Sequence, residues 1–144
     1  MKLRFIFAIA ALWAGGALAF NQVDVEKLQN TGSCPKCDLS NFPFPSTANL
    51  TNANLQDANL QGAILTKVTL VGANLTNSNL LDANLKKADL RGARLEAADL
   101  RNANLRSANL RSANLKGAKL EGANLERAKL EGAFLENVNG LKRF

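Results

Sequence analysis

A leucine falls on every fifth residue from Leu50 to Leu135, and a small residue lies two positions before each of them. That small residue is alanine in sixteen of the eighteen repeats, with Val68 and Ser78 as the exceptions. On an α-helix each step of five residues rotates the side chain by about 140°, so the leucines would form no stripe. On a flat strand an odd repeat sends successive leucines to opposite faces. The pattern therefore predicts short extended pieces joined by turns, wound into a coil with its leucines inside.

The second residue after the leucine is suited to a tight turn. It is glycine in six repeats and asparagine or aspartate in six others. These residue types tolerate the positive φ that such turns require. The glycines are Gly62, Gly72, Gly92, Gly117, Gly122 and Gly132, and the others are Asn52, Asp57, Asn77, Asp82, Asn102 and Asn137.

The runs that begin at Ala53, Ala83 and Ala108 read Ala-Asn-Leu-Gln-Asp, Ala-Asn-Leu-Lys-Lys and Ala-Asn-Leu-Arg-Ser. They resemble the pentapeptide-repeat family, and the resemblance covers about two-thirds of the chain. It implies an all-β fold, a right-handed quadrilateral β-helix with four pentapeptides per coil, whose interior is filled by the leucine and the preceding alanine. Residues n and n+20 would then lie in adjacent coils, about 4.8 Å apart.

Opposite charges recur at the predicted spacing of twenty residues. Exposed pairs of this kind contribute only about 0.2 to 1 kcal/mol each, so they support the register more than the stability. The expected pairs are Arg101 with Glu121, Arg106 with Glu126, Arg111 with Glu131, Lys116 with Glu136, Glu96 with Lys116, and Asp99 with Lys119.

Two degenerate repeats, 37–41 and 42–46, precede the regular ones, and Thr47 shifts the frame by one residue. The β-helix is therefore predicted over residues 37–138, with five coils. An N-terminal cap is predicted over 20–36, where Val25 and Leu28 suit one short helix that covers the first coil.

The pattern decays after Leu135, and a C-terminal cap or tail is predicted over residues 139–144. Phe134 replaces the usual outward asparagine with a bulky ring. With Leu141 and Phe144 it is expected to form a small cap, since a solenoid must cover its end, and the alternative is a dimer contact at this end.

Residues 1–19 are predicted to be a signal peptide. Lys2 and Arg4 precede an apolar run from Phe5 to Leu18 and a small-residue site at residues 17–19, which indicates cleavage before Phe20. The run is shorter than the ~20 residues of a membrane-spanning helix, so no transmembrane segment is expected in the mature chain. The expected location is periplasmic or secreted, or the thylakoid lumen in a photosynthetic organism.

The two cysteines, Cys34 and Cys37, lie in Cys-Pro-Lys-Cys and admit three interpretations. A structural disulfide that fixes the cap to the first coil suits an oxidising compartment. A redox-active pair lacks the βαβ context of thioredoxin-like proteins. A zinc half-site would need two further ligands from a second chain. The structural disulfide is favoured.

The net charge of +6 is concentrated in one part of the chain. The basic belt of residues 86–119 is a candidate surface for an anionic partner such as lipid head groups, polysaccharide or an acidic protein. Nucleic acid fits less well, because export separates the chain from it and no aromatic residues interleave for stacking. The alternative is a solvated, ion-paired surface. The belt comprises Lys86, Lys87, Arg91, Arg94, Arg101, Arg106, Arg111, Lys116 and Lys119.

Catalytic chemistry has few candidates in this sequence. It has no histidine and no tyrosine, and its carboxylates are spread over separate turns. Asp89 and Asp99 precede leucines in neighbouring columns, but two-carboxylate catalysis requires a cleft between the carboxylates. We therefore expect no enzymatic activity, no cofactor and no metal.

These observations favour an exported, non-enzymatic structural or protein-interaction module with an unknown protein partner. Anion binding by the basic belt is the second hypothesis, and thiol redox activity at Cys34 and Cys37 is the third. Some cytosolic members of the family that the chain resembles are acidic rods that imitate DNA and protect a topoisomerase. This chain differs in the sign of its charge and in its expected compartment, so that function is not transferred.

Overall fold

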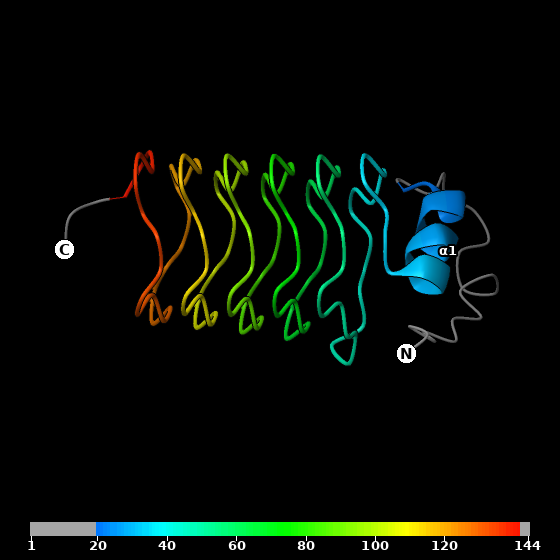
Figure 1. The fold of residues 1–144 in the computed structure, drawn as a ribbon, viewed down its shortest axis with the longest axis horizontal. Helices are drawn as coiled ribbons and strands as arrows, with labels where there is room; N and C mark the ends of the chain where they lie inside the picture. Colours follow the sequence, from blue (N-terminus) through cyan, green and yellow to red (C-terminus); the bar gives the residue numbers. More distant parts are fainter. Residues whose placement is uncertain (1–19, 142–144) are drawn as a thin grey trace.

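A computed structural model describes residues 20–141, which form one helix followed by a stack of coils (Figure 1). From Asn49 onward, parallel bridges join residues twenty apart, ending with Lys119 and Asn139. Each coil of twenty residues thus holds four five-residue repeats and four turns. The predicted register of n with n+20 is confirmed.

Backbone hydrogen bonds connect every inner repeat to the coils on both sides. Asp89 N–H donates to the carbonyl of Val68 at 3.0 Å, and Leu90 N–H donates to the carbonyl of Asn109 at 2.8 Å. Ala93 N–H donates to the carbonyl of Leu90 at 3.0 Å and closes the turn between them. Each repeat therefore bonds one coil back, one coil forward and across its own turn.

The interior is built from the two positions of each repeat that the sequence pattern indicates. One is the leucine, and the other is the small residue two places before it. Every leucine from Leu50 to Leu115 is completely buried, and the alanines that precede them are buried as well. Ser78 is the one buried polar side chain among the described residues, and its hydroxyl donates to the carbonyl of Leu75 at 2.8 Å. The interior is a column of aliphatic side chains in which the exceptional hydroxyl has a partner.

The turns have the backbone conformation that the sequence predicts. In all eighteen repeats the second residue after the leucine has a φ between 55° and 72°. The conformation extends to side chains that do not favour it, including Lys67, Lys87 and Arg127. The turn is therefore imposed by the coil and is only partly encoded by the residue that occupies it.

The first coil departs from the later ones. Its bridges join residues twenty-one apart, as in Ser33 with Asn54, which confirms the frame shift at Thr47. Pairing begins at Ser33 rather than at residue 37, because Cys34 and Cys37 occupy the interior positions that leucine and alanine hold elsewhere. The predicted boundary between residues 36 and 37 was placed too late, and at the other end pairing reaches Asn139 rather than residue 138.

Helix α1 (Gln22–Thr31) lies at the N-terminal end of the stack (Figure 1). The side chain of Asn21 accepts a hydrogen bond from Val23 N–H at 3.0 Å, and Gly32 ends the helix with a φ of 68°. Val25 and Leu28 are buried in the same hydrophobic cluster as the leucines of the coils. The helix is thus packed on the interior column through one apolar face.

The C-terminal end has no equivalent element within residues 20–141. Leu125, Leu130 and Leu135 of the last coil are only partly buried. Phe134 is 59% exposed and bridges Asn114 from the outward position, and the predicted cap of Phe134 with Leu141 and Phe144 stays a prediction, because Phe144 is not among the described residues. Phe144 and the predicted signal peptide, 1–19, lie outside the described residues.

Candidate functional site

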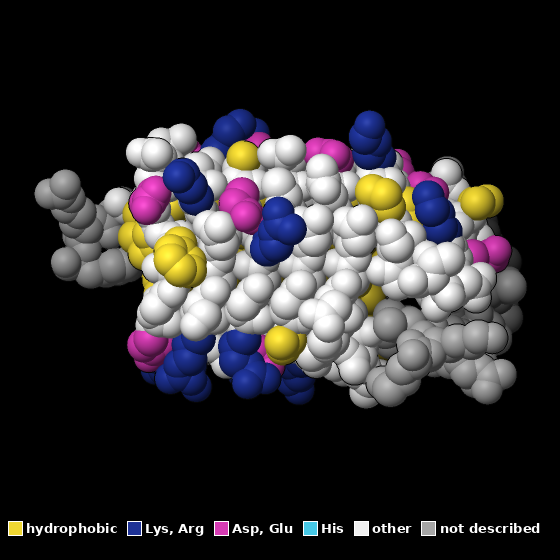
Figure 2. All heavy atoms as spheres, viewed as in Figure 1, with side chains coloured by type: hydrophobic (Ala, Val, Ile, Leu, Met, Phe, Trp, Pro, Cys, Tyr) yellow, Lys and Arg dark blue, Asp and Glu magenta, His cyan; other side chains and the backbone are white. Residues whose placement is uncertain are grey.

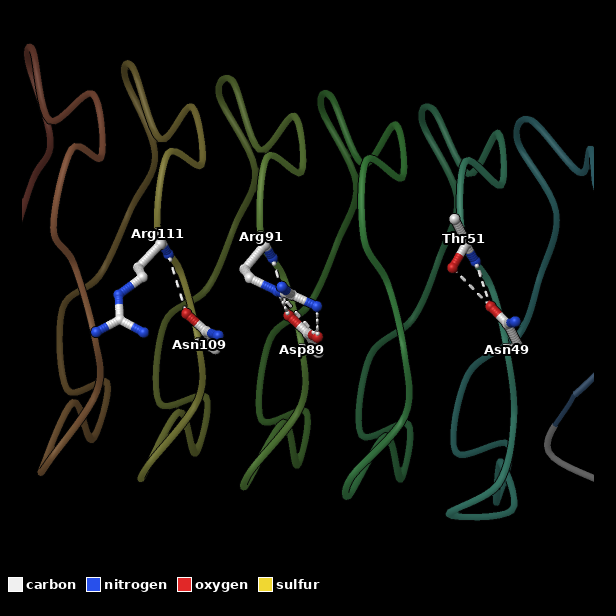
Figure 3. Close-up of polar contacts among 6 residues, drawn as sticks. All are labelled: Asn49, Thr51, Asp89, Arg91, Asn109 and Arg111. Carbon is white, nitrogen blue, oxygen red and sulfur yellow. Dashed lines mark hydrogen bonds and ion pairs between the residues drawn. The ribbon is translucent and has the colours of Figure 1, made fainter.

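Asparagine before the leucine satisfies a backbone donor that the coils leave without a partner. Its side-chain oxygen accepts a hydrogen bond from the N–H two residues further on, as from Thr51 to Asn49 at 3.1 Å and from Arg111 to Asn109 at 3.4 Å (Figure 3). Asx turns of this kind explain why ten of the eighteen repeats have asparagine there. The outer surface is therefore held by local polar bonds beside the turns that follow asparagine.

The register sorts the nine residues of the predicted basic belt onto four columns of turns. Lys86, Lys87 and Arg106 share the column formed by residues 66–67, 86–87, 106–107 and 126–127, here called the basic turn column. The other six are divided among the remaining columns, as Arg91 with Arg111, Arg94 with Lys116, and Arg101 with Lys119. The predicted belt consequently runs around the tower, with members on all four columns, and is not confined to one side.

Charge is unevenly divided among the four columns. Here each column includes the residue before the leucine of each repeat as well as the turn that follows that leucine. Over residues 48–139 the basic turn column has five cations and one carboxylate, and the other three columns together have seven cations and eight carboxylates. Lys67 and Arg127 belong to this column but lie outside the predicted belt, and only the spacing of twenty residues could have revealed them. Its charged residues are Lys67, Lys86, Lys87, Arg106, Glu126 and Arg127.

Ion pairs across adjacent coils form where the repeat has asparagine before its leucine. Arg106 approaches Glu126 at 3.3 Å, Arg111 approaches Glu131 at 3.1 Å, and Lys116 approaches Glu136 at 3.1 Å. These three predicted pairs are confirmed. Figure 2 shows one face of the tower, where Asp or Glu side chains lie beside several of the Lys and Arg side chains.

Where aspartate precedes the leucine, the arginine that follows the leucine pairs with this aspartate rather than with a carboxylate of the next coil. Arg91 pairs with Asp89 at 2.7 Å (Figure 3), and Arg101 pairs with Asp99 at 2.6 Å. Arg101 with Glu121 and Asp99 with Lys119 therefore form no close ion pair, although the two members of each pair still attract one another across the coils. A carboxylate two residues away is closer than one in the next coil, and it accepts two parallel bonds from the guanidinium.

Glu96 also departs from its predicted pair with Lys116. Its carboxylate accepts from the Asn114 amide at 2.9 Å and from the Thr76 hydroxyl at 3.2 Å, and it lies 3.5 Å from Arg94. Glu96 thus bridges three coils through neutral donors and one cation.

Ion pairing fixes the protonation state of the two aspartates that precede leucines. The hydrogen bond from Arg91 lowers the pKa of Asp89, and the hydrogen bond from Arg101 lowers the pKa of Asp99, while partial burial opposes both shifts. Both carboxylates are ionised and engaged at neutral pH, which suits neither for proton transfer.

Cys34 and Cys37 are bonded through their sulfur atoms, with a Cα to Cα distance of 5.4 Å, and both are buried. The carbonyl oxygen of Asp24 lies 3.1 Å from the Cys34 sulfur, and the Asp24 carboxylate accepts a hydrogen bond from Asp38 N–H at 2.8 Å. Asp24 and the cysteines form the one cluster of metal-ligand types among residues 20–141. The bond between the sulfurs removes the thiolates that a metal would need.

A groove of about 810 Å³ lies at the C-terminal end of the tower. Apolar side chains of the last coil and its neighbour form much of its lining, including Leu120, Ala123, Leu125, Ala128 and Leu130. In the preceding coil Leu105 N–H donates to the carbonyl of Asn124 at 2.8 Å, whereas Leu125 and Leu130 N–H have no partner among the described residues. Within residues 20–141 the end therefore combines apolar surface with unpaired strand edges.

The fold is a right-handed parallel β-helix of five-residue repeats. A family model of pentapeptide repeats matches residues 46–82, 78–117 and 118–140, in eight copies. The chain belongs to the pentapeptide-repeat family.

Solved structures of this family resemble the chain over most of its length. A pentapeptide repeat protein, Rfr23, from the cyanobacterium Cyanothece 51142 is 35% identical with a TM-score of 0.67, covering 81% of this chain and 97% of that one. HetL from the cyanobacterium Nostoc sp. strain PCC 7120 is 34% identical with a TM-score of 0.49, covering 79% and 63%. No curated protein matches the chain. Within residues 20–141, no helix has the length and apolar character needed to cross a membrane.

Proposed function

We propose that the chain is an exported, non-enzymatic interaction module whose C-terminal end pairs with a second copy of the chain. One observation carries this proposal: the apolar side chains and free backbone groups of the last coil are not covered by any of residues 20–141. Unpaired strand edges are templates for pairing with another chain, and apolar surface beside them adds a hydrophobic driving force.

A second copy of the chain can bind this end because the last coil offers both backbone N–H donors and backbone carbonyl acceptors. Leu125 and Leu130 present free N–H groups, and Ala123 and Ala128 present carbonyls without partners among the described residues. One coil earlier, the corresponding carbonyl of Ala103 accepts from Asn124 N–H at 2.9 Å. A surface that carries both kinds of group can be complementary to itself across a two-fold axis.

Self-association can be tested by replacing Phe134 with asparagine. Phe134 is a 59% exposed ring on the last coil, and asparagine is the commonest residue at its repeat position, so Phe134→Asn should fold normally. Ile64→Asn is the matched control, because Ile64 is 46% exposed at the same repeat position in an earlier coil. In analytical ultracentrifugation the wild type should dimerise as its concentration rises.

We expect Phe134→Asn to weaken dimerisation at least about fivefold through lost apolar burial, and Ile64→Asn to leave it unchanged. A wild-type chain that stays monomeric throughout the accessible concentration range contradicts the proposal. Equal weakening by both variants would also count against it, since the contact would then not be confined to the C-terminal end.

Export is part of the proposal and rests on residues 1–19, with cleavage before Phe20. The compartment is then periplasmic, extracellular or, in a photosynthetic organism, the thylakoid lumen, where the bond between Cys34 and Cys37 would persist. Intact-mass analysis of the native protein should give a chain that begins at Phe20 and lacks two hydrogens. A retained leader or two free thiols would contradict this part of the proposal.

The absence of enzymatic activity is supported by the chemistry of the polar groups. The sequence has no histidine, and Asp89 and Asp99 are held by arginines. The buried position of Cys34 and Cys37 favours a structural disulfide over redox activity, since a thiol partner must reach the sulfur it attacks.

We also infer that α1 caps the N-terminal end and that the coils are four-sided. Burial of Val25 and Leu28 against the interior column supports the capping role, because uncapped solenoid ends expose apolar side chains. Four turns in each twenty-residue coil support the quadrilateral cross-section.

A further inference from the structure

We propose that the basic turn column binds a linear anionic polysaccharide laid along the axis of the tower. This inference goes beyond the pairing of C-terminal ends, because it uses a different surface and a different class of ligand. It rests on the stacking of the cations and on the scarcity of ion-pair partners for them within residues 20–141. It also rests on two unfavourable features, like charges in register and long side chains at positive φ.

Backbone bonds place the cations of the column in successive coils. Lys67 N–H donates to the carbonyl of Lys86 at 3.0 Å, and Lys87 N–H donates to the carbonyl of Arg106 at 3.0 Å. Adjacent coils are separated by about 4.8 Å, so four coils present a straight row of positive charge about 14 Å long. A linear polymer with an acidic group on each unit or two can follow such a row.

Most of this charge is left without an internal partner. Lys67, Lys86 and Lys87 make no ion pair within residues 20–141, whereas six of the nine cations in the predicted belt do. The single carboxylate of the column, Glu126, is shared between Arg106 at 3.3 Å and Arg127 at 3.6 Å. The column therefore keeps a local excess of positive charge that the other columns neutralise.

Like charges lie in register on this column. Lys67 is followed by Lys87 one coil on, and Lys86 is followed by Arg106. Like charges directly opposite one another on paired strands are destabilising. Arg91 and Arg111 also lie in register on another column, but each of them has a carboxylate partner, Asp89 and Glu131 respectively.

The same column also has long basic side chains where the backbone favours small ones. Lys67, Lys87 and Arg127 have φ values of 63°, 59° and 59°. On the other three columns, residues 52–137 hold only glycine, asparagine, aspartate, serine or alanine at this turn position. Left-handed conformations are unfavourable for residues with a Cβ other than asparagine and aspartate, so Ala97 and Ser112 carry this cost too, but over the same residues long cations occur there only on the basic turn column. Like charges in register, most of them without carboxylate partners within residues 20–141, and long cations at positive φ coincide on this column, which indicates a role for its charge.

The shape of the column favours a polymer chain over a membrane surface. The basic row is one turn wide, and the three neighbouring columns together carry no excess of positive charge. The exposed large hydrophobic residues within 20–141 are Val23, Ile64 and Phe134, and only Ile64, which precedes the first turn of the column, belongs to it. Peripheral membrane binding usually joins a broad basic face to apolar side chains that insert.

Heparin is the probe for this site, and the test compares two double variants with the same change in charge. Lys67→Asn with Lys87→Asn removes two cations of the column and places asparagine where φ is positive. Lys119→Asn with Lys129→Asn is the control, because neither lysine makes an ion pair within residues 20–141 and asparagine is the usual residue at their repeat position. Both variants should fold.

At ~0.15 M salt we expect the column variant to bind heparin about tenfold more weakly than the wild type and to melt at a higher temperature. The control should change the affinity less than about twofold, and Glu126→Gln should increase it. Equal losses in the two double variants would show a response to net charge alone and would overturn the proposal. So would a wild type that binds vesicles of phosphatidylglycerol and phosphatidylcholine but not heparin, or one that binds neither.

Discussion

Replacing Leu90 with alanine should cost far more stability than the same change at Leu130, although the two leucines lie on one interior column. Leu90 is completely buried, and the register places Leu70 and Leu110 in the adjacent coils. Leu→Ala at a site that cannot collapse costs about 3 to 5 kcal/mol. Hydrogen bonds to both neighbouring coils hold the backbone around Leu90 and oppose collapse.

Leu130 has a leucine on only one side, because it lines the open groove of the last coil. Its truncation forfeits less buried surface and leaves no closed cavity, so we expect a cost of about 1 to 2 kcal/mol. Urea denaturation followed by circular dichroism measures both, provided that the slope of each transition stays unchanged. Equal costs would refute an interior that is closed in the middle and open at the C-terminal end.

Two further predictions concern polar side chains. Asp99→Asn should cost under about 1 kcal/mol at pH 7, because it removes an exposed ion pair with Arg101. Since the folded-state pKa of Asp99 is lowered, its stabilising effect is present above about pH 4 and is lost as the pH falls through that pKa, so thermal melts should show less acid destabilisation in the variant than in the wild type. Ser78→Ala should change the free energy of unfolding by less than about 0.5 kcal/mol, because the carbonyl of Leu75 still accepts from the backbone N–H of residue 78; a loss above about 1.5 kcal/mol would contradict this assignment.

The repeated core was predictable because its period admits only one solution. Leucine every five residues is incompatible with a helix or a flat strand, the family resemblance implied four repeats per coil, and charges twenty residues apart, such as Arg111 and Glu131, supported that number. The first coil was harder to delimit, since Cys34 and Cys37 replace leucine and alanine at interior positions. The start of the first coil therefore lacks the alanine and leucine that mark the later repeats.

The errors in charge pairing have a local cause. Whether Arg101 reaches Glu121 in the next coil depends on the residue two positions before it, and Asp99 captures it first. Where that residue is asparagine, as at Asn104, its oxygen accepts the backbone N–H and the arginine extends to the next coil. The sequence shows whether aspartate or asparagine precedes the leucine. Only the structure shows that aspartate holds the arginine side chain, whereas asparagine bonds the backbone N–H alone.

The predicted belt was counted along the chain, so its nine cations are distributed over four columns. Lys86 and Arg91 are close in sequence and lie on different columns, whereas Lys67 and Lys87 lie on the same one. In a solenoid, functional surfaces follow the stacking period, so charge has to be summed at intervals of twenty residues.

Hydrogen exchange of single amides at low and high protein concentration tests most directly the claim that the C-terminal end of the β-helix is a pairing surface. Leu105 and Leu110 N–H, which bond to the next coil at 2.8 Å, should be protected at every concentration. Leu125 and Leu130 N–H should exchange rapidly at low concentration and become protected as the chain associates. Protection of Leu125 and Leu130 that is already complete at low concentration, or that never appears as concentration rises, would contradict the account.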